Sequence, residues 1–146
     1  MKVVAFITLL LALIGCSSMT PQNDSAAATT VAKAIDDALK SGDPVLRVER
    51  FTGIEWDRVE VFGPYTPASE IESKIGSDER IRRAGVESRD DITLLVFLKG
   101  NTVTAVVEAP RSKADFSPLA GTAIKPGDCL KVEPGEPPNV QRGTGC

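Results

Sequence analysis

The chain has 146 residues, of which 42% are hydrophobic and 25% are charged, and this composition suits one globular domain with a single core. Its formal net charge of −3 argues against a nucleic-acid partner, which requires a basic surface. The sequence contains no histidine, which excludes Ser-His-Asp and Cys-His catalysis and any zinc or haem site that uses histidine from this chain.

The first fifteen residues have the pattern of an export signal. Lys2 supplies a positive charge, and the run from Val3 to Ile14 is an apolar core of the length found in secretory signals. A membrane span needs about 20 apolar residues, so this run is too short to cross a bilayer. Gly15 directly before Cys16 resembles the lipobox at which bacterial lipoproteins are cleaved. We therefore expect removal of residues 1–15 and diacylation of Cys16; an ordinary secretory signal that contains a cysteine is the alternative.

A tether and a first helix are predicted after the signal. Residues 16–25 are mostly polar and include a proline, which predicts a flexible tether between the lipid and the fold. Ser17, rather than an aspartate, follows the cysteine and resembles the pattern of lipoproteins that are forwarded to an outer membrane. Apolar residues at helical spacing predict a surface helix over residues 26–40. We expect a single domain over residues 26–146.

The segment over residues 51–65 is the most distinctive part of the chain after the signal. It holds four of the seven aromatic residues, namely Phe51, Trp56, Phe62 and Tyr65. Residues 57–62 alternate between polar and apolar, which predicts a strand that ends at Gly63 and Pro64. Thr66 and Pro67 then fit the N-cap and the first position of a helix.

The second half of the chain predicts one more helical turn, over residues 78–84, and three strands. The strand over 92–98 is almost entirely apolar and should be covered on both faces at the centre of a sheet. Gly100-Asn101 suits a two-residue type II′ turn, so a strand over 102–108 should complete a hairpin. A last strand is expected over 129–133. The whole pattern predicts an α+β fold: a small antiparallel sheet of three to four strands with a central hairpin and two helices packed on one face.

The cysteine count agrees with export. If Cys16 is lipidated, Cys129 and Cys146 remain as a pair in an oxidising compartment, and we expect a disulfide between them. This bond would close the tail over residues 133–145, which is rich in glycine and proline. Two free thiols or an intermolecular bond are the alternatives.

A resemblance to a family rests on the pattern Phe-Thr-x-x-Glu-Trp-Asp-x-Val-x-Val-Phe-Gly-Pro-Tyr-Thr-Pro over residues 51–67. A short helix and a Leu-Leu-Val-Phe hairpin follow it. Together these features resemble a family of small uncharacterised bacterial envelope proteins, many of which look like lipoproteins. The resemblance covers residues 52–116 and implies an envelope location and a shared small fold. It implies no reaction, so it predicts no catalytic residue, metal or cofactor.

A candidate binding surface comprises Glu55, Trp56, Asp57 and Tyr65. The rings of Trp56 and Tyr65 could stack on a peptide or a sugar. Core packing is the alternative, and we favour it for Trp56, while for Tyr65 the two interpretations are balanced. Asp57 is expected to fix the loop by accepting hydrogen bonds from the backbone or from the tyrosine hydroxyl.

Charged clusters offer weaker hypotheses. Glu55, Asp57 and Glu60 could act as paired acids in glycoside hydrolysis, but charges along an exposed strand are more common, and the spacing matches no calcium loop. Four arginines could hold an anion: Arg80, Arg82, Arg83 and Arg89. Acidic residues between them favour a self-compensating surface instead.

The leading hypothesis is therefore a non-enzymatic lipoprotein at the periplasmic face of the outer membrane. It would attach to the membrane through its lipid and act as an interaction or accessory protein for an envelope protein or cell-wall glycan. The alternative is a small glycan-binding or carboxylate-dependent glycan-acting protein.

Overall fold

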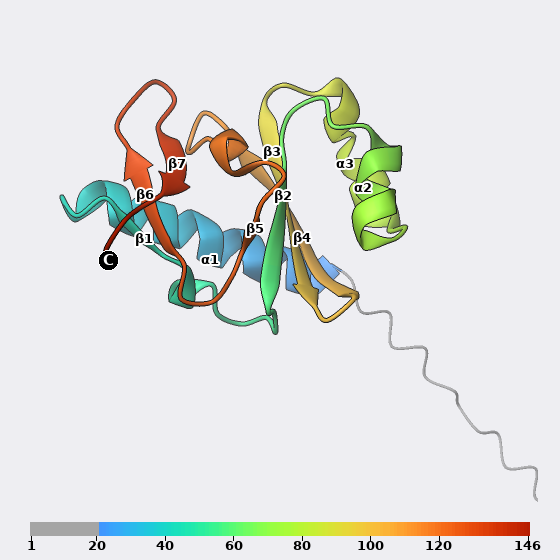
Figure 1. The fold of residues 1–146 in the computed structure, drawn as a ribbon, viewed down its shortest axis with the longest axis horizontal. Helices are drawn as coiled ribbons and strands as arrows, with labels where there is room; N and C mark the ends of the chain where they lie inside the picture. Colours follow the sequence, from blue (N-terminus) through green and yellow to red (C-terminus); the bar gives the residue numbers. More distant parts are fainter. Residues whose placement is uncertain (1–20) are drawn as a thin grey trace, which may run out of the picture.

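The computed structural model describes residues 21–146, with side chains from residue 24, so the predicted signal and lipidation site lie outside the described residues. The fold is α+β, as predicted. Three helices, α1 (Pro21–Lys40), α2 (Ala68–Ile75) and α3 (Glu79–Ala84), surround two antiparallel sheets (Figure 1).

The central sheet has the strand order β4-β3-β2-β5. Its strands are β2 (Arg58–Phe62), β3 (Ile92–Lys99), β4 (Thr102–Pro110) and β5 (Ala123–Ile124). The apolar strand β3 lies between β2 and β4, and every side chain from Ile92 to Leu98 is buried, as the sequence predicts. The β3–β4 hairpin turns at Gly100, whose φ of +58° is the backbone conformation that a type II′ turn requires at its first central position.

Both faces of the central sheet are covered. On one face α2 and α3 pack through Ile71 and Ile81 against β2 and β3, so two helices share one face as predicted. On the opposite face lies α1, which the sequence predicts as a surface helix. It buries a stripe of small and branched side chains, namely Ala27, Val31, Ala34, Ile35 and Ala38. The sheet therefore has a core on each side, which explains why β3 is apolar on both faces.

Helix α1 begins at Pro21, five residues before the predicted start, so the last part of the predicted tether is helical. Asp24 explains the early start. Its Oδ1 accepts a hydrogen bond from the backbone N–H of Val106 at 2.8 Å and one from Arg80 at 3.1 Å. Since β4 is an edge strand, these contacts also satisfy a backbone group that the sheet leaves unpaired.

A second, three-stranded sheet packs beside α1 with the strand order β1-β6-β7. It consists of β1 (Val45–Arg47), β6 (Cys129–Glu133) and β7 (Asn139–Arg142). The sequence predicts β6 but not β7, which follows a proline-rich loop and carries a single buried side chain, Val140. Leu46, Leu130, Val132 and Val140 join this sheet to the core under α1.

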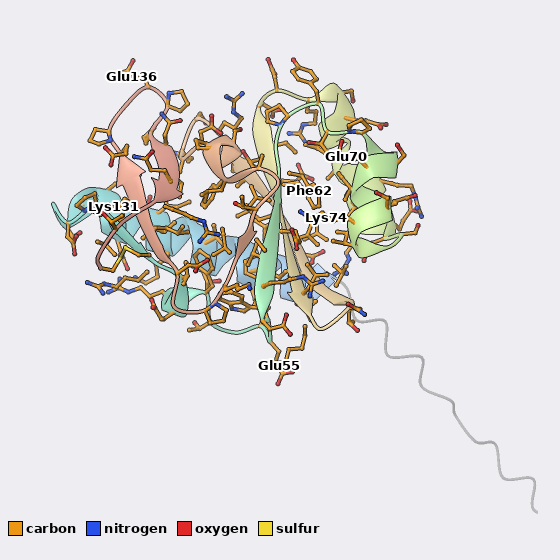
Figure 2. All side chains as sticks on the ribbon, in the orientation of Figure 1. Glu55, Phe62, Glu70, Lys74, Lys131 and Glu136 are labelled. Carbon is orange, nitrogen blue, oxygen red and sulfur yellow. A yellow bond between two sulfur atoms is a disulfide. The ribbon has the colours of Figure 1, made fainter. Side chains whose placement is uncertain are left out.

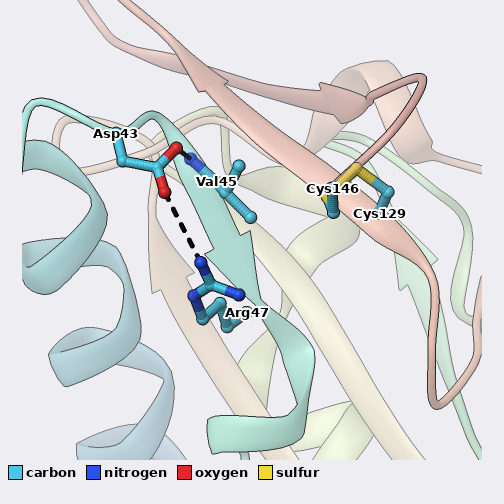
Figure 3. The surroundings of a disulfide bond; sticks show 5 residues. All are labelled: Asp43, Val45, Arg47, Cys129 and Cys146. Carbon is cyan, nitrogen blue, oxygen red and sulfur yellow. Dashed lines mark hydrogen bonds and ion pairs between the residues drawn. A yellow bond between two sulfur atoms is a disulfide. The ribbon is translucent and has the colours of Figure 1, made fainter.

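A disulfide joins Cys129 and Cys146, whose Cα atoms are 5.6 Å apart. Figure 3 shows the bond beside β1, where Asp43 accepts a hydrogen bond from the N–H of Val45 at 3.3 Å and pairs with Arg47 at 3.5 Å. A disulfide that closes a loop of 17 residues contributes roughly 3 kcal/mol in the chain-entropy model. The bond therefore ties the C-terminal tail to the second sheet.

The start of α2 differs from the prediction. Thr66 does not cap the helix, because its hydroxyl donates to the carbonyl oxygen of Gly63 at 2.7 Å. The N-cap position is Pro67, which has no side-chain acceptor. Instead, Glu87 accepts a hydrogen bond from the N–H of Ala68 at 3.1 Å. A carboxylate distant in sequence thus supplies the cap, which a local pattern cannot reveal.

Candidate functional site

Tyr65 combines high exposure with an unusual backbone conformation. Its residue surface is 61% exposed, and its φ is +61°. Within residues 21–146 no other non-glycine residue has a positive φ. The left-handed region costs a residue with a β-carbon about 1–2 kcal/mol. An exposed residue that carries such a cost is a candidate for function, because burial does not offset it.

The turn around Tyr65 is held by its neighbours on both sides. The N–H of Tyr65 donates to the carbonyl oxygen of Val86 at 2.9 Å, and Thr66 closes onto Gly63. Pro64 and Pro67 remove two backbone donors and restrict the chain before and after the tyrosine. The ring is therefore presented to solvent from a turn with little conformational freedom.

A groove lies at the same end of the central sheet. Phe62 pairs with Leu94, and the end of β4 at Pro110 pairs with Ile92, so Tyr65 and the residues after β4 follow the ends of the two strands that flank β3. The groove has a volume of about 600 Å³. Its lining includes Asp90, Arg111, Ser112, Glu136, Pro137 and Pro138. Figure 2 shows Glu136 at the tip of the β6–β7 loop, which forms one wall.

Arg111 lines this groove, at the end of the central sheet where Tyr65 also lies. Its guanidinium donates to the carbonyl oxygen of Asp90 and to Oδ2 of Asp115, each at 2.7 Å. The hydrogen bond to Asp115 is the main cause of the raised pKa of Arg111, and Tyr65 makes a smaller electrostatic contribution. We define the Tyr65 surface as Tyr65, Asp90, Arg111, Glu136 and Pro137. It offers an aromatic ring, a fixed cation, two acids and an apolar wall.

Asp115 supports this surface from below. Burial opposes ionisation of its carboxyl, but hydrogen bonds from Arg111 and Ser117 outweigh that effect and lower the pKa of Asp115. The N–H of Ser117 donates at 2.8 Å, and the hydroxyl of Thr93 on β3 donates at 3.4 Å. The carboxylate therefore stays charged at neutral pH and holds Arg111 in place.

The backbone of Asp115 also connects the two sheets. Its N–H donates to Pro138 at 2.7 Å, and its carbonyl oxygen accepts from Val140 on β7 at 2.8 Å. Sequence reasoning missed this residue, although Asp115-Phe116-Ser117 has the spacing of an aspartate that accepts from the N–H two residues later. The groove consequently has walls from both sheets.

Trp56 is half-buried against the core and does not lie on the Tyr65 surface. Its ring meets Phe97 edge-on at a centroid distance of 6.0 Å and Phe51 at 6.1 Å. Its Nε1 donates to the carbonyl oxygen of Phe51 at 3.0 Å. Packing thus covers part of the indole ring that could otherwise stack on a ligand.

Asp57 and Glu55 lie at the hairpin end of the sheet, away from Tyr65. Asp57 accepts a hydrogen bond from the N–H of Gly100 at 2.7 Å, so it fixes the β3–β4 turn and not the loop around Tyr65. Glu55 is exposed at the same end (Figure 2). The five residues of β2, which span about 17 Å, separate these acids from the tyrosine loop. The four residues of the candidate surface therefore do not form one surface.

Glu60 is buried on the face of β2 that α2 covers, with 6% of its surface exposed. Lys74 reaches it at 2.7 Å and also lies over the ring of Phe62, while Nε of Arg58 is 3.3 Å away (Figure 2). Arg58 also pairs with Asp57 at 3.7 Å. Two cations thus neutralise Glu60, which gives this carboxylate a structural role rather than the freedom that acid–base catalysis needs.

Three of the four arginines singled out from the sequence are paired. Arg80 binds Asp78 and Asp24, Arg82 binds Glu72 and Glu79, and Arg89 binds Asp91 and Glu108. Arg83 has no ion pair within the described residues. The self-compensating interpretation therefore holds for most of this surface.

Neither metal ligation, membrane-spanning helices nor comparison with known proteins points to a further candidate function for the described residues. Within residues 21–146 there is no group of acidic, cysteine or histidine side chains that could hold a metal ion, and no helix is long and apolar enough to cross a membrane. Comparison of the chain with protein-family models, with curated proteins and with solved structures found no match. The resemblance to small envelope lipoproteins accordingly stays a prediction from the sequence.

Proposed function

We propose that this chain is an exported lipoprotein that is anchored through Cys16 at the periplasmic face of the outer membrane. There it acts as a non-enzymatic accessory protein that binds an envelope protein through the Tyr65 surface. The apolar run before Cys16 supports the anchor, because it suits a signal and is too short for a span. Diacylation supplies two fatty acyl chains, which is the number that stable membrane anchoring requires.

The observation that carries the binding role is the exposed ring of Tyr65 on a turn whose backbone is constrained. A tyrosine provides a large contact area at low entropic cost, and tyrosines are enriched among the residues that dominate protein interfaces. Arg111, which Asp115 holds in place, adds a pre-oriented cation at the same end of the central sheet. A non-enzymatic role agrees with the acidic residues, since Asp57, Glu60 and Asp115 each serve a structural contact.

Affinity capture from envelope extract tests this proposal. The full, acylated chain carries a tag after Cys146, and we expect one envelope protein in stoichiometric amount. Tyr65→Gly should abolish capture without unfolding the domain, because glycine adopts the positive φ freely. Lys125→Ala, at an exposed lysine without an ion pair in the described domain, is the matched control and should capture normally.

The glycan alternative uses the same ring, since an exposed aromatic can also stack on a sugar. Sedimentation with purified cell-wall sacculi separates the two roles. Binding to sacculi that Tyr65→Gly abolishes, without capture of any protein, would contradict the accessory role in favour of glycan binding. If Tyr65→Gly still captures the protein and still binds sacculi, the Tyr65 surface serves neither role.

A further inference from the structure

Strand β4 is an outer edge of the central sheet, because it has a neighbouring strand, β3, on one side only. The N–H of Arg111, directly after β4, bonds the carbonyl oxygen of Asp91 at 2.9 Å. By contrast, the N–H of Val106 points away from β3, to Asp24. Hydrogen-bonding direction alternates along an antiparallel strand, so the odd-numbered residues from 107 to 111 bond towards β3. Val106 and Glu108 therefore direct their backbone groups outward.

Three of these outward backbone groups have no partner in the part of the chain that the structure describes. Asp24 occupies the N–H of Val106 at 2.8 Å. The carbonyl oxygen of Val106, and both the N–H and the carbonyl oxygen of Glu108, make no hydrogen bond there. Glu108 is exposed, so solvent reaches this stretch of the strand. An unpaired strand edge of this kind is a template on which another extended chain can pair.

A groove of about 580 Å³ lies along this edge, between α1 and α3. Its lining includes Ala28 from α1, Arg83 from α3, and Val106, Val107 and Glu108 from β4. The two helices cover opposite faces of the strand, since Val107 belongs to the core under α1 and Val106 to the core under α3. The edge of β4 is therefore left open between the helices, with a shape that suits an extended chain.

The free charge in this groove is positive. Both acids that line it are already paired, Asp24 with Arg80 at 3.1 Å and Glu108 with Arg89 at 2.6 Å. Arg83 is exposed and has no acidic partner within residues 24–146. A segment that carries a carboxylate complements this cation. A second copy of the chain does not, because its own groove offers the same cation and no free acid.

We propose that the β4 edge binds an extended peptide segment of a partner protein, and that this segment carries an acidic side chain. In antiparallel register, its residue opposite Glu108 exchanges two backbone hydrogen bonds with Glu108. The residue two positions later donates a third to the carbonyl oxygen of Val106. Asp24 occupies the next donor, so the pairing is limited to this short stretch.

The register also places the acidic side chain. Residues that lie opposite each other on antiparallel strands project their side chains to the same face of the sheet. Val106 packs into the core under α3, and Glu108, two residues later, shares that face. The segment therefore directs the side chains at its pairing positions towards α3, where Arg83 lies. This surface is separate from the Tyr65 surface and does not depend on the lipid anchor.

A library of random nine-residue peptides, displayed on phage and selected on the purified full chain, supplies the probe. We expect the selected peptides to share an Asp or Glu among residues that favour strands. Glu108→Pro should bind them about ten-fold or more weakly than Glu108→Ala, because both variants lose the same side chain but only proline removes the outward N–H. Proline is tolerated where the N–H of an edge strand faces solvent, so the sheet should form in both variants.

Charge reversal tests the assigned cation. Arg83→Glu should weaken binding of the acidic peptides about five-fold or more. Lys99→Glu is the matched control, because it makes the same change of charge at an exposed residue outside the groove, and it should bind as the unaltered chain does. Equal affinities of these two variants would overturn the role of Arg83.

Hydrogen exchange in the unaltered chain tests the pairing without any substitution. A bound peptide should slow exchange of the Glu108 amide about ten-fold or more. An unprotected Glu108 amide in the peptide-saturated chain overturns the proposal, as do equal affinities of folded Glu108→Pro and Glu108→Ala or a selection that enriches no peptide. Protection of this amide by dimerisation of the chain alone, seen in size-exclusion chromatography, would overturn the partner segment in favour of a second copy. These measurements use neither lipid nor envelope extract, so their failure is distinct from failure of the anchor or of the Tyr65 surface.

Discussion

At the residue scale, Tyr65 is the position where the backbone conformation does not suit the residue that adopts it. Its positive φ is unfavourable for a tyrosine, and its ring gains little from burial because most of it faces solvent. A natural sequence is locally consistent with its fold in most places, so an uncompensated exception indicates selection for something other than stability. Pro64 and Pro67 make a rigid loop around Tyr65 predictable from the sequence, but no sequence pattern predicts the positive φ of Tyr65.

Tyr65→Gly should therefore raise the free energy of unfolding by about 0.5–1 kcal/mol, because glycine adopts the positive φ without strain. The greater conformational entropy of glycine in the unfolded chain cancels only part of this gain. Urea denaturation of the disulfide-bonded protein measures the change. Tyr65→Ala is the control, since it keeps a β-carbon at the same φ and should bring no gain. A clear loss of stability in the glycine variant would show that the ring supports the fold.

Asp115→Asn should destabilise the domain by about 1–3 kcal/mol at neutral pH, because it removes the charged partner of Arg111. The folded-state pKa of Asp115 lies below its ordinary value of 3.8, so its stabilising contribution is complete above about pH 4 and is lost as pH falls through the lower value. The difference between wild type and variant should shrink below pH 4 in urea titrations. A difference that stays constant from pH 7 to about pH 3 would contradict this role.

At the scale of elements, local patterns predicted those parts of the fold that depend on neighbouring residues. The apolar run of β3 and the Gly100-Asn101 turn identified the central hairpin, and Asp78 caps α3 through the N–H of Arg80. The missed features depend on distant contacts. Strand β7 pairs with β6 although its sequence has one buried side chain. The start of α1 depends on Val106, which lies 82 residues later in the chain.

Asp24→Ala should loosen this start of α1. It removes the acceptor for the N–H of Val106 and one partner of Arg80, so we expect a loss of about 1–3 kcal/mol and faster hydrogen exchange at the Val106 amide. Asp36→Ala is a matched control on the same helix, because its exposed pair with Lys40 should contribute less than about 0.5 kcal/mol. Equal effects of the two substitutions would exclude Asp24 as the residue that fixes the helix.

At the scale of the whole molecule, the central sheet places Trp56 and Tyr65 at opposite ends of β2. The distinctive segment over residues 51–65 is continuous in sequence, but β2 divides it, so Trp56 joins the core at one end and Tyr65 reaches solvent at the other. The groove beside Arg111 forms only because Asp115 joins the central sheet to β7. Sequence patterns identified the tyrosine loop, while the groove required the tertiary arrangement of segments far apart in the chain.

The proposed lipid anchor at Cys16 is the claim on which the compartment and the attachment of the domain depend. Intact mass spectrometry of the chain purified from bacterial membranes measures it most directly. We predict a mass that lacks residues 1–15 and carries added fatty acyl groups such as palmitate, with fragmentation that places them on Cys16. A free thiol at Cys16, or a chain that still begins at Met1, would contradict the account.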